Sequence, residues 1–281
     1  MYDGDFLSDR VSLQRAVGEL RVAVKRFGAE TVLDELRQVG CLKARLPRRA
    51  VSGWMDLVML NTGGGVAGGD RLDLSFRVGA GGQATIAAQA AERFYRALET
   101  DPPSRVRTQL TVAAGGALEW LPQETILFDR SALDRRLDVE LAEDARFLGV
   151  ETVVFGRAAM GELVQKGWLR DLIRVRRGGD LLLHDAIRID GAVDELLRGP
   201  AIGNGGNTVA TVVCVAPDVD AKLPVLRSVF ADAAPEVGAS VWNGMLVVRI
   251  LGAGSAMVRR AVVAALAVLR EDRPLPRVWL C

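Results

Sequence analysis

The chain has 281 residues, of which 49% are hydrophobic and 25% are charged. This composition is typical of a globular protein and excludes a wholly disordered chain. The 36 Lys and Arg residues nearly balance the 35 Asp and Glu residues, so the formal net charge is +1. That balance argues against a protein that coats nucleic acid or an anionic membrane. The longest apolar run on an expected helix, residues 261–269, is less than half of the roughly 20 residues that span a membrane.

Soft metal ligands and general bases are scarce. His184 is the single histidine, and Cys41, Cys214 and Cys281 lie far apart without a CxxC pair. Most acid–base catalysis near neutral pH uses histidine, so a conventional hydrolase or metalloenzyme is not expected. The cysteine pattern predicts no disulfide framework, and the acidic N-terminus shows no secretory signal. We therefore expect a cytoplasmic protein in which Cys281 is an exposed, incidental thiol.

Hydrophobic and polar residues alternate along several segments, a pattern typical of strands with one buried face. Residues 147–155 are apolar on both faces, which predicts a strand covered on both sides. Residues 1–16 are polar and predict a loose start of the chain. The alternating segments are residues 20–24, 72–78, 106–112 and 137–141.

Three segments, residues 72–86, 108–120 and 137–155, each contain a strand, a turn of small or polar residues and a second strand. Stacking of such units predicts a mainly β fold, a two-layer β-helix or solenoid-like stack of strands with a few helices. A plain antiparallel sandwich would show the same pattern. We expect one domain over residues 1–281, with a flexible loop at the glycine-rich residues 199–206.

Helices are few. The strongest prediction is residues 255–270, near the C-terminus, where Ser255 could cap a helix with an apolar stripe. Residues 223–233 and 90–98 are weaker candidates. Residues 31–39 could be half strand and half turn.

A glycine-rich segment, residues 61–70, contains Gly63, Gly65 and Gly68 in the spacing GxGxxG. A dinucleotide-binding loop of this type must open a helix, whereas here an alternating strand follows directly. No Lys-Ser/Thr pair follows either, which excludes a P-loop. We therefore interpret the segment as a tight turn in which Asp70 accepts hydrogen bonds from backbone amides.

Acidic residues lie within strongly apolar stretches. Glu119, Glu124 and Asp129 fall in residues 118–129, and Glu151 falls in the doubly apolar strand. Buried carboxylates are costly unless they are paired or bind a cation. Two interpretations stay open: a structural network with arginines, or a carboxylate-lined site or path for a hard or weakly held cation. The arginines considered for such a network are Arg130, Arg135 and Arg146.

Residues 156–162 form another motif, in which glycines flank a turn of small residues. Arg157 and Glu162 are expected to form an ion pair that closes this turn.

Taken together, these segments resemble the UreD (UreH) family of urease accessory proteins. The most specific strings are Leu-Glu-Trp-Leu-Pro-Gln-Glu-Thr-Ile-Leu-Phe at 118–128 and Gly-Arg-x-x-x-Gly-Glu at 156–162, supported by residues 64–72, 91–96 and 276–279. The motif residues expected to have structural roles are Gly64, Gly65, Gly68, Gly69, Tyr95, Trp120, Pro122, Gly156, Arg157 and Gly161.

The resemblance implies a maturation factor that is not an enzyme. It implies a scaffold that binds apo-urease and, with UreF and the GTPase UreG, helps to deliver nickel to the urease active site. No nucleic acid or membrane is expected as a partner. A dimer within the accessory complex is possible. With so few His and Cys residues we expect no tightly bound cofactor and only transient nickel. The carboxylates that could line an internal nickel path are Asp70, Glu119, Glu124, Asp129, Glu151 and Glu162.

A second class of function is a carboxylate-dependent enzyme on a β-solenoid, such as a glycosidase, which needs two carboxylates about 5–10 Å apart on an exposed face. Such an enzyme would also favour a groove lined with aromatic residues, whereas aromatic residues make up only 5% of the chain. A nucleotide-binding protein, the third class, would require a helix directly after Gly69.

Overall fold

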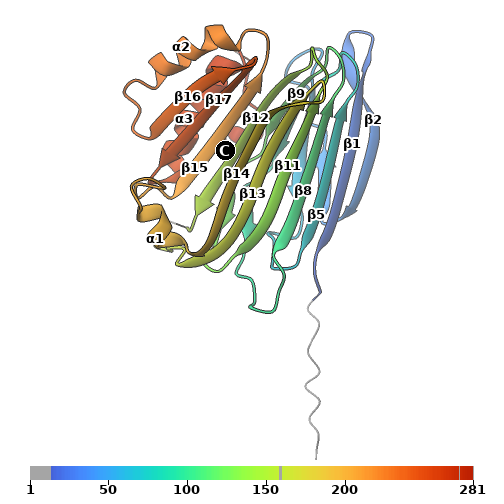
Figure 1. Cartoon of the computed structure of the whole chain (residues 1–281). Coiled ribbons are helices and arrows are strands. Elements are labelled where there is room, and N and C mark those ends of the chain that lie inside the picture. Colours follow the sequence, from blue (N-terminus) through green and yellow to red (C-terminus); the bar gives the residue numbers. More distant parts are fainter. Residues whose placement is uncertain (1–13, 158–159, 272, 281) are drawn as a thin grey trace, which may run out of the picture.

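Two β-sheets lie face to face in the computed structural model, which describes residues 14–157, 160–271 and 273–280 (Figure 1). The fold is mainly β, as the alternating segments predicted. Cys281 and most of the predicted loose start lie outside the described residues. None of the helices in the described ranges has the length and apolar character needed to cross a membrane.

The sheet that faces the viewer in Figure 1 has seven strands within the described residues. Parallel strands make up its centre, and antiparallel pairs form both of its edges. In spatial order, its strands are β14 (Asp180–Ala192), β13 (Lys166–Arg177), β11 (Ala132–Leu141), β8 (Ser104–Val112), β5 (Arg71–Val78), β1 (Val17–Phe27) and β2 (Glu30–Gly40).

The sheet behind it has ten strands within the described part of the chain. Its main path runs through β16 (Glu236–Trp242), β17 (Met245–Gly252), β15 (Thr208–Val215), β12 (Arg146–Phe155), β9 (Ala117–Leu121), β6 (Gln83–Ala88), β4 (Met55–Asn61) and β3 (Leu42–Arg45). Two short strands lie off this path, β10 (Thr125–Leu127) and β7 (Glu92–Phe94), and β10 pairs with both β12 and β7.

The three predicted strand–turn–strand units connect the sheets. Each unit places its first strand in the seven-stranded sheet and its second strand in the ten-stranded sheet, and equivalent strands of successive units pair in parallel. Both sheets are open at their edges in the described residues, and the predicted β-helix or solenoid-like stack is not confirmed. Large apolar side chains from both inner faces form the core between the sheets, among them Leu20, Phe76, Leu110, Leu118 and Leu133.

Helices α2 (Val219–Val229) and α3 (Ser255–Leu269) pack on the outer side of β15, β16 and β17, and α1 (Val193–Arg198) follows β14 (Figure 1). The two helix predictions near the C-terminus are confirmed, but Ser255 is not the cap. Gly254 holds the N-cap position, and no side chain caps the helix there.

Two weaker predictions were wrong. Residues 31–39 lie entirely within β2, which pairs along its length with β1. Residues 90–98 form no helix, because Glu92–Phe94 pairs with β10 as β7. Backbone hydrogen bonds to a strand distant in sequence outweigh the weak local preference for a helix.

The ten-stranded sheet is interrupted between β9 and β10. Strand β12 pairs with β9 up to Gly149 and with β10 only from Val153 onward. Pro122 follows directly after β9, and a proline has no amide hydrogen to donate to a ladder. The neighbouring strand is interrupted at the same level, because β6 ends at Ala88 and β7 begins at Glu92. This break leaves an opening from the outer face of the sheet to the space between the sheets.

Candidate functional site

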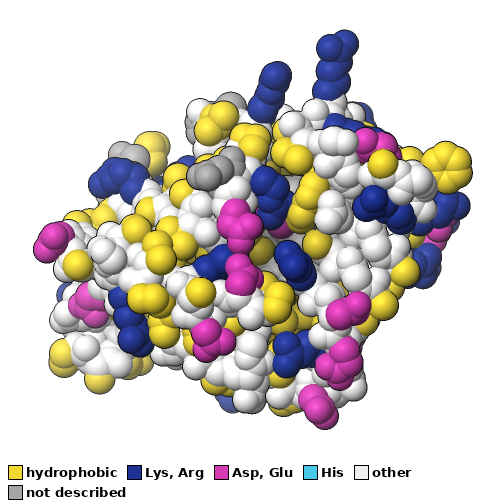
Figure 2. All heavy atoms as spheres, turned by 90° about the horizontal axis from the view of Figure 1, so that it is seen from above, with side chains coloured by type: hydrophobic (Ala, Val, Ile, Leu, Met, Phe, Trp, Pro, Cys, Tyr) yellow, Lys and Arg dark blue, Asp and Glu magenta, His cyan; other side chains and the backbone are white. Residues whose placement is uncertain are grey.

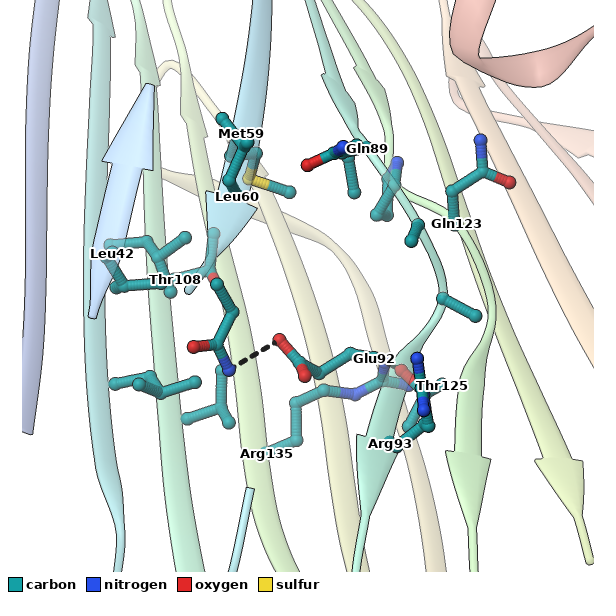
Figure 3. Close-up of a pocket in the computed structure, with 18 of the residues that line it drawn as sticks. Leu42, Met59, Leu60, Gln89, Glu92, Arg93, Thr108, Gln123, Thr125 and Arg135 are labelled. Atoms are coloured by element: carbon teal, nitrogen blue, oxygen red, sulfur yellow. Dashed lines mark hydrogen bonds between the residues drawn. The ribbon is translucent and has the colours of Figure 1, made fainter. Parts of the chain in front are cut away.

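A cavity of about 170 Å³ lies between the two sheets behind this break. Residues Gln89–Ala91 and Gln123 line it where the ten-stranded sheet is interrupted, and Leu72, Leu74 and Val106 line it on the opposite sheet (Figure 3). Polar side chains reach into this otherwise apolar space from both sheets. They are Asn61, Glu92, Thr108, Thr125, Arg135 and Glu151.

Glu92 is a carboxylate in this cavity to which no arginine or lysine of the described residues is bonded. Its Oε2 accepts a hydrogen bond of 3.1 Å from Asn61 Nδ2, drawn as a dashed line in Figure 3. Burial raises the pKa of Glu92, and the bond from Asn61 opposes that shift only in part. The sequence prediction missed Glu92, because residues 92–95 are two charged residues followed by two aromatic ones and show no alternation that would indicate a strand.

Glu151 belongs to a buried ionic cluster that joins the two sheets. Arg135 of β11 donates from Nη1 to Glu151 Oε2 over 2.6 Å and to Thr125 Oγ1 over 2.8 Å. It also donates to both oxygens of Asp171 on β13, over 2.8 and 2.5 Å. Trp120 Nε1 donates to the other oxygen of Glu151 over 2.7 Å. Every member is therefore held in one orientation by more than one bond or by a rigid ring.

The cluster carries one more negative than positive charge. Burial raises the pKa of Glu151, and the attraction of Arg135 opposes this shift. The pKa of Arg135 is raised by the neighbouring Asp171 and Glu151 carboxylates, against the effect of burial. One guanidinium shared by two carboxylates in a medium of low dielectric constant creates a site that favours a cation.

Beyond Arg135 lies a second, much smaller void of about 10 Å³. Arg135 and Glu151 line both voids, so this pair interrupts the space between the sheets. Asp171 and Asp185 line the smaller void, and Asp185 accepts a bond of 2.8 Å from Arg249 of β17. Carboxylates thus follow one another across the interior, from Glu92 at the break to Asp185 on the edge strand β14.

Glu119 lies on the opposite face of the ten-stranded sheet. It accepts bonds of 2.9 to 3.1 Å from Arg270, a bond of 2.8 Å from Thr85, and an ion pair of 2.5 Å from Arg273. Glu119, Arg270 and Arg273 line a hollow of about 420 Å³ at the end of the molecule where the β8–β9 and β11–β12 turns lie. Figure 2 looks down on this end, where acidic and basic side chains surround the hollow.

The remaining predicted carboxylates bind arginines or backbone amides outside the cavity between the sheets. Glu124 accepts from Arg259 over 2.8 Å. Asp129 accepts from the amides of residues 165 and 166, and Asp70 accepts from those of residues 16 and 67, which confirms its predicted role in the turn. Glu162 pairs with Arg157 over 2.7 Å, as predicted, and this pairing holds its pKa below the ordinary value. Of the six predicted carboxylates, Glu151 is the one that lines the cavity between the sheets.

The three arginines expected for a structural network differ in whether they bind a carboxylate. Arg135 is the partner of Glu151, whereas Arg130 lies 3.7 Å from Asp129. The side chain of Arg146 forms no hydrogen bond or ion pair with the part of the chain that the structure describes. The arginines that bind Glu119 come from the C-terminal segment, which the sequence did not indicate.

The glycine-rich segment runs into strand β5, and no helix follows it, so the dinucleotide-loop interpretation is excluded. Its glycines allow a close approach of Tyr95. Gly65 has φ +146°, and a Cβ atom there would lie 2.3 Å from the Tyr95 ring. Tyr95 also donates from its hydroxyl to the Gly64 carbonyl oxygen over 2.8 Å.

The motif at 156–162 serves a similar close turn. Gly156 has φ +83°, and a Cβ atom there would lie 2.5 Å from the Glu162 carbonyl oxygen. The guanidinium of Arg157 stacks over Phe128 at 4.2 Å, and Phe128 meets Tyr95 edge to face at 5.1 Å. These motif residues therefore form one continuous surface, although residues 158 and 159 lie outside the described residues.

Within the described residues, no three His, Cys, Asp or Glu side chains come together as a ready metal-binding group. Burial raises the pKa of the Cys214 thiol to about 12 and also raises that of Cys41, so neither favours the thiolate form. The chemistry that the cavity offers is that of carboxylate, amide and hydroxyl oxygens, which bind divalent cations weakly and exchangeably.

The chain matches the model of the family described as UreD urease accessory protein over residues 16–280. It is 42% identical over 269 residues to a urease accessory protein UreD of Azorhizobium caulinodans, covering 95% of this chain and 97% of that protein. It is 41% identical to proteins of the same name from Xanthobacter autotrophicus, covering 96% of this chain and 92% of that protein, and from Rhizobium leguminosarum bv. viciae, covering 95% and 96%. These relatives are named as accessory proteins of urease, which confirms that the chain is not an enzyme. The chain therefore belongs to the UreD family of urease accessory proteins.

Proposed function

We propose that this protein is a scaffold in urease maturation that binds apo-urease and, with UreF and the GTPase UreG, helps to deliver nickel to the urease active site. The observation that carries the proposal is the largely apolar space between the sheets, beside the break in the ten-stranded sheet, with carboxylates placed along its length. We propose that nickel is held only transiently, that no cofactor is bound tightly, and that the protein works in the cytoplasm. The thiols of Cys41 and Cys214 are free, in keeping with a reducing compartment.

The nickel path runs between the sheets. Glu92 meets the cation behind the break, and the cluster of Glu151 and Asp171 attracts it farther inward. Asp185 lies at the far end, near the edge formed by β14 and β17. A path that must release its cargo needs weak sites, and oxygen ligands without imidazole or thiolate meet that need.

Arg135 closes this path at its centre in the present conformation. Passage of a cation requires its guanidinium to leave the carboxylates, and the cavity beside it provides room for that movement. A divalent cation that replaces the guanidinium would neutralise both carboxylates, whereas Arg135 neutralises one.

A first test is co-purification of the full chain with and without a UreF-type partner, followed by size-exclusion chromatography and metal analysis. We expect a soluble complex with the partner that holds little nickel. A well-behaved monomer that ignores the partner would contradict the scaffold function.

A second test fills the cavity. Thr108 is buried on the inner face of β8, whereas Thr111 is exposed on the outer face of the same strand. In a reconstituted system of apo-urease, accessory proteins and nickel, Thr108→Phe should slow urease activation, and Thr111→Phe should not. The size-exclusion profile of each complex should stay unchanged. Equal activation by both variants would exclude a path through this cavity.

A further inference from the structure

The hollow beside Glu119 is separate from the cavity between the sheets and shares no lining residue with it. It lies over the start of β9, whereas the break in the ten-stranded sheet follows the end of that strand. Gln83, Ala117 and Arg146 line one wall, where they are neighbours in register on β6, β9 and β12. Helix α2 and the chain that follows α3 complete the wall.

Positive charge is in excess on the side of the hollow that the sheet forms. Glu119 is bound by both Arg270 and Arg273, at 2.9 and 2.5 Å. Arg146 lies on β12 two residues before Leu148, the neighbour of Glu119 in register. It is exposed, and its side chain bonds to no described residue. Three guanidinium groups therefore gather around one carboxylate that binds them.

The other carboxylates that line the hollow are already engaged. Asp144 accepts a hydrogen bond of 2.9 Å from the amide of Gly115. Asp218 and Glu271 both hold Lys222, at 2.9 and 2.7 Å. The sheet side thus carries three arginines and two carboxylates, and the helix side carries one lysine and two carboxylates. An anion is attracted to the sheet side and repelled by the helix side, which limits it to a small group.

Arg273 is held with part of its guanidinium free. The group stacks on Trp54 at 3.9 Å, and its Nε donates to the Arg270 carbonyl oxygen over 3.3 Å. Its Nη2 lies 2.5 Å from Glu119, whereas Nη1 donates to no acceptor among the described residues. Burial lowers the pKa of Arg273, Glu119 opposes this shift, and the charge of Arg270 adds to it. This cation therefore has less negative charge around it than its burial requires.

The arginines determine the chemistry of the ligand. A guanidinium binds an oxyanion through two parallel N–H···O bonds, which a spherical ion such as chloride cannot accept in the same way. The volume of the hollow, about 420 Å³, admits one small oxyanion together with water molecules. A nucleic acid does not fit, because the carboxylates on the helix side would repel a chain of phosphates.

We propose that this hollow binds one small oxyanion of the phosphate or sulfate type, held by Arg146 and by the free nitrogen of Arg273. The anion joins strand β12 to the C-terminal segment. Farther along, that segment is fastened to β9 by the bond of 3.0 Å from Trp279 Nε1 to the Leu121 carbonyl oxygen. Binding therefore stabilises the packing of the C-terminal segment on the sheet. The site involves neither nickel nor urease, so it is independent of the proposed function.

Calorimetric titration and thermal unfolding of the purified full chain test the proposal, with inorganic phosphate as the probe. At ten times the dissociation constant, phosphate should raise the unfolding temperature by about 3 °C above that in chloride of equal ionic strength. Arg146→Ala should weaken phosphate binding at least tenfold and remove this rise. Because the Arg146 side chain is exposed and unbonded, the variant should keep its fold, which circular dichroism checks.

Arg170→Ala is the matched control. Arg170 of β13 is exposed, its side chain bonds to no described residue, and it lies on the other sheet. Both variants lose one positive charge, so a general effect of charge or of excluded salt would change them equally. Phosphate binding that is lost only in Arg146→Ala supports the proposal. Unchanged binding by Arg146→Ala, an equal loss in both variants, or an equal rise in chloride would overturn it.

Discussion

Glu119 on β9 is buried, and the side chain of Glu151 on β12 is only 11% exposed. Both are held by arginine, yet they lie on opposite faces of the same sheet. Glu119 is enclosed by two arginines of the C-terminal segment, Arg270 and Arg273, which satisfy both of its oxygens. Glu151 shares one arginine with Asp171 and borders free volume on two sides. A buried ion pair is therefore not evidence of function in itself; the free volume beside it and the balance of charge determine what it can do.

The largest expected effect comes from breaking the Glu119 side of this comparison. Glu119→Gln leaves two guanidinium groups without a carboxylate beneath the C-terminal segment. We expect the free energy of unfolding to fall by about 3 kcal/mol or more, because a lost partner leaves uncompensated charge. Urea denaturation followed by circular dichroism measures the change.

A matched control is Glu143→Gln, because Glu143 is 77% exposed and lies 4.0 Å from Arg177. Its stability should stay near that of the wild type. If both variants unfold at the same urea concentration, the enclosed Glu119 ion pairs contribute no more to stability than the exposed Glu143 ion pair, which would contradict the prediction.

Glu151→Gln should lower the free energy of unfolding less than Glu119→Gln does, but it should reduce urease activation more. Arg135 keeps both oxygens of Asp171, and the new amide oxygen can still accept from Trp120, so we expect a stability loss of about 1 kcal/mol. The rate of urease activation should fall about tenfold or more, because a charge facing a cation in low dielectric contributes at least 1.4 kcal/mol. Activation assays with nickel in the complete accessory complex test this. Unchanged activation would remove Glu151 from the path.

Glu92 tests whether the cavity carries an uncompensated carboxylate. Its pKa in the folded state is raised above the ordinary 4.5, so the native state holds the proton more tightly than the unfolded state. Wild-type stability relative to Glu92→Gln should therefore fall as the pH rises above about 4.5, by about 1.4 kcal/mol for each unit of pKa shift. Denaturation curves between pH 4 and pH 7 measure the difference.

Glu162 supplies a control of opposite sign. Its pKa is lowered, chiefly by the hydrogen bond from Arg157, so its contribution to stability is present above pH 4.5 and is lost as the pH falls. Wild-type stability relative to Glu162→Gln should rise as the pH rises toward 4.5 and then stay level, whereas the Glu92 difference falls only above that pH, so the curves for Glu162 start well below pH 4.5. Parallel trends would contradict the assignment of the two environments.

The smallest effect is expected at Arg157, whose side chain is 43% exposed. Arg157→Ala should lower the free energy of unfolding less than any of the destabilising variants above, since exposed ion pairs are screened by solvent. Thermal unfolding at low and high salt checks this prediction. A loss as large as that of Glu151→Gln would show that stacking on Phe128 matters more than the ion pair.

Local patterns predicted much of the fold. Alternation located β1, β5, β8 and β11, because a strand with one buried face shows its period in every pair of residues. A run that is apolar on both faces located β12. The apolar stripe located α3 almost to the residue. Residues 90–98 were misassigned and α1 was missed, because their structure depends on pairing or packing with distant segments.

The candidate site was predicted only in part. Glu151 was identified because a carboxylate in a doubly apolar strand needs a partner. Glu92, Asp171 and Asp185 were not identified, although they line the same interior space. They come from separate strands, and no local spacing joins them.

The sequence by itself determined which segments are strands, that histidine and cysteine chemistry is nearly absent, and which motifs the chain shares with its family. Tertiary structure alone decided which face of each strand looks into the cavity and which arginine meets which carboxylate. The physical reason is that a two-residue repeat shows which side chains share one face of a strand. It does not show which other segment covers that face. Glu119 illustrates this, because Arg270, 151 residues farther along the chain, encloses it.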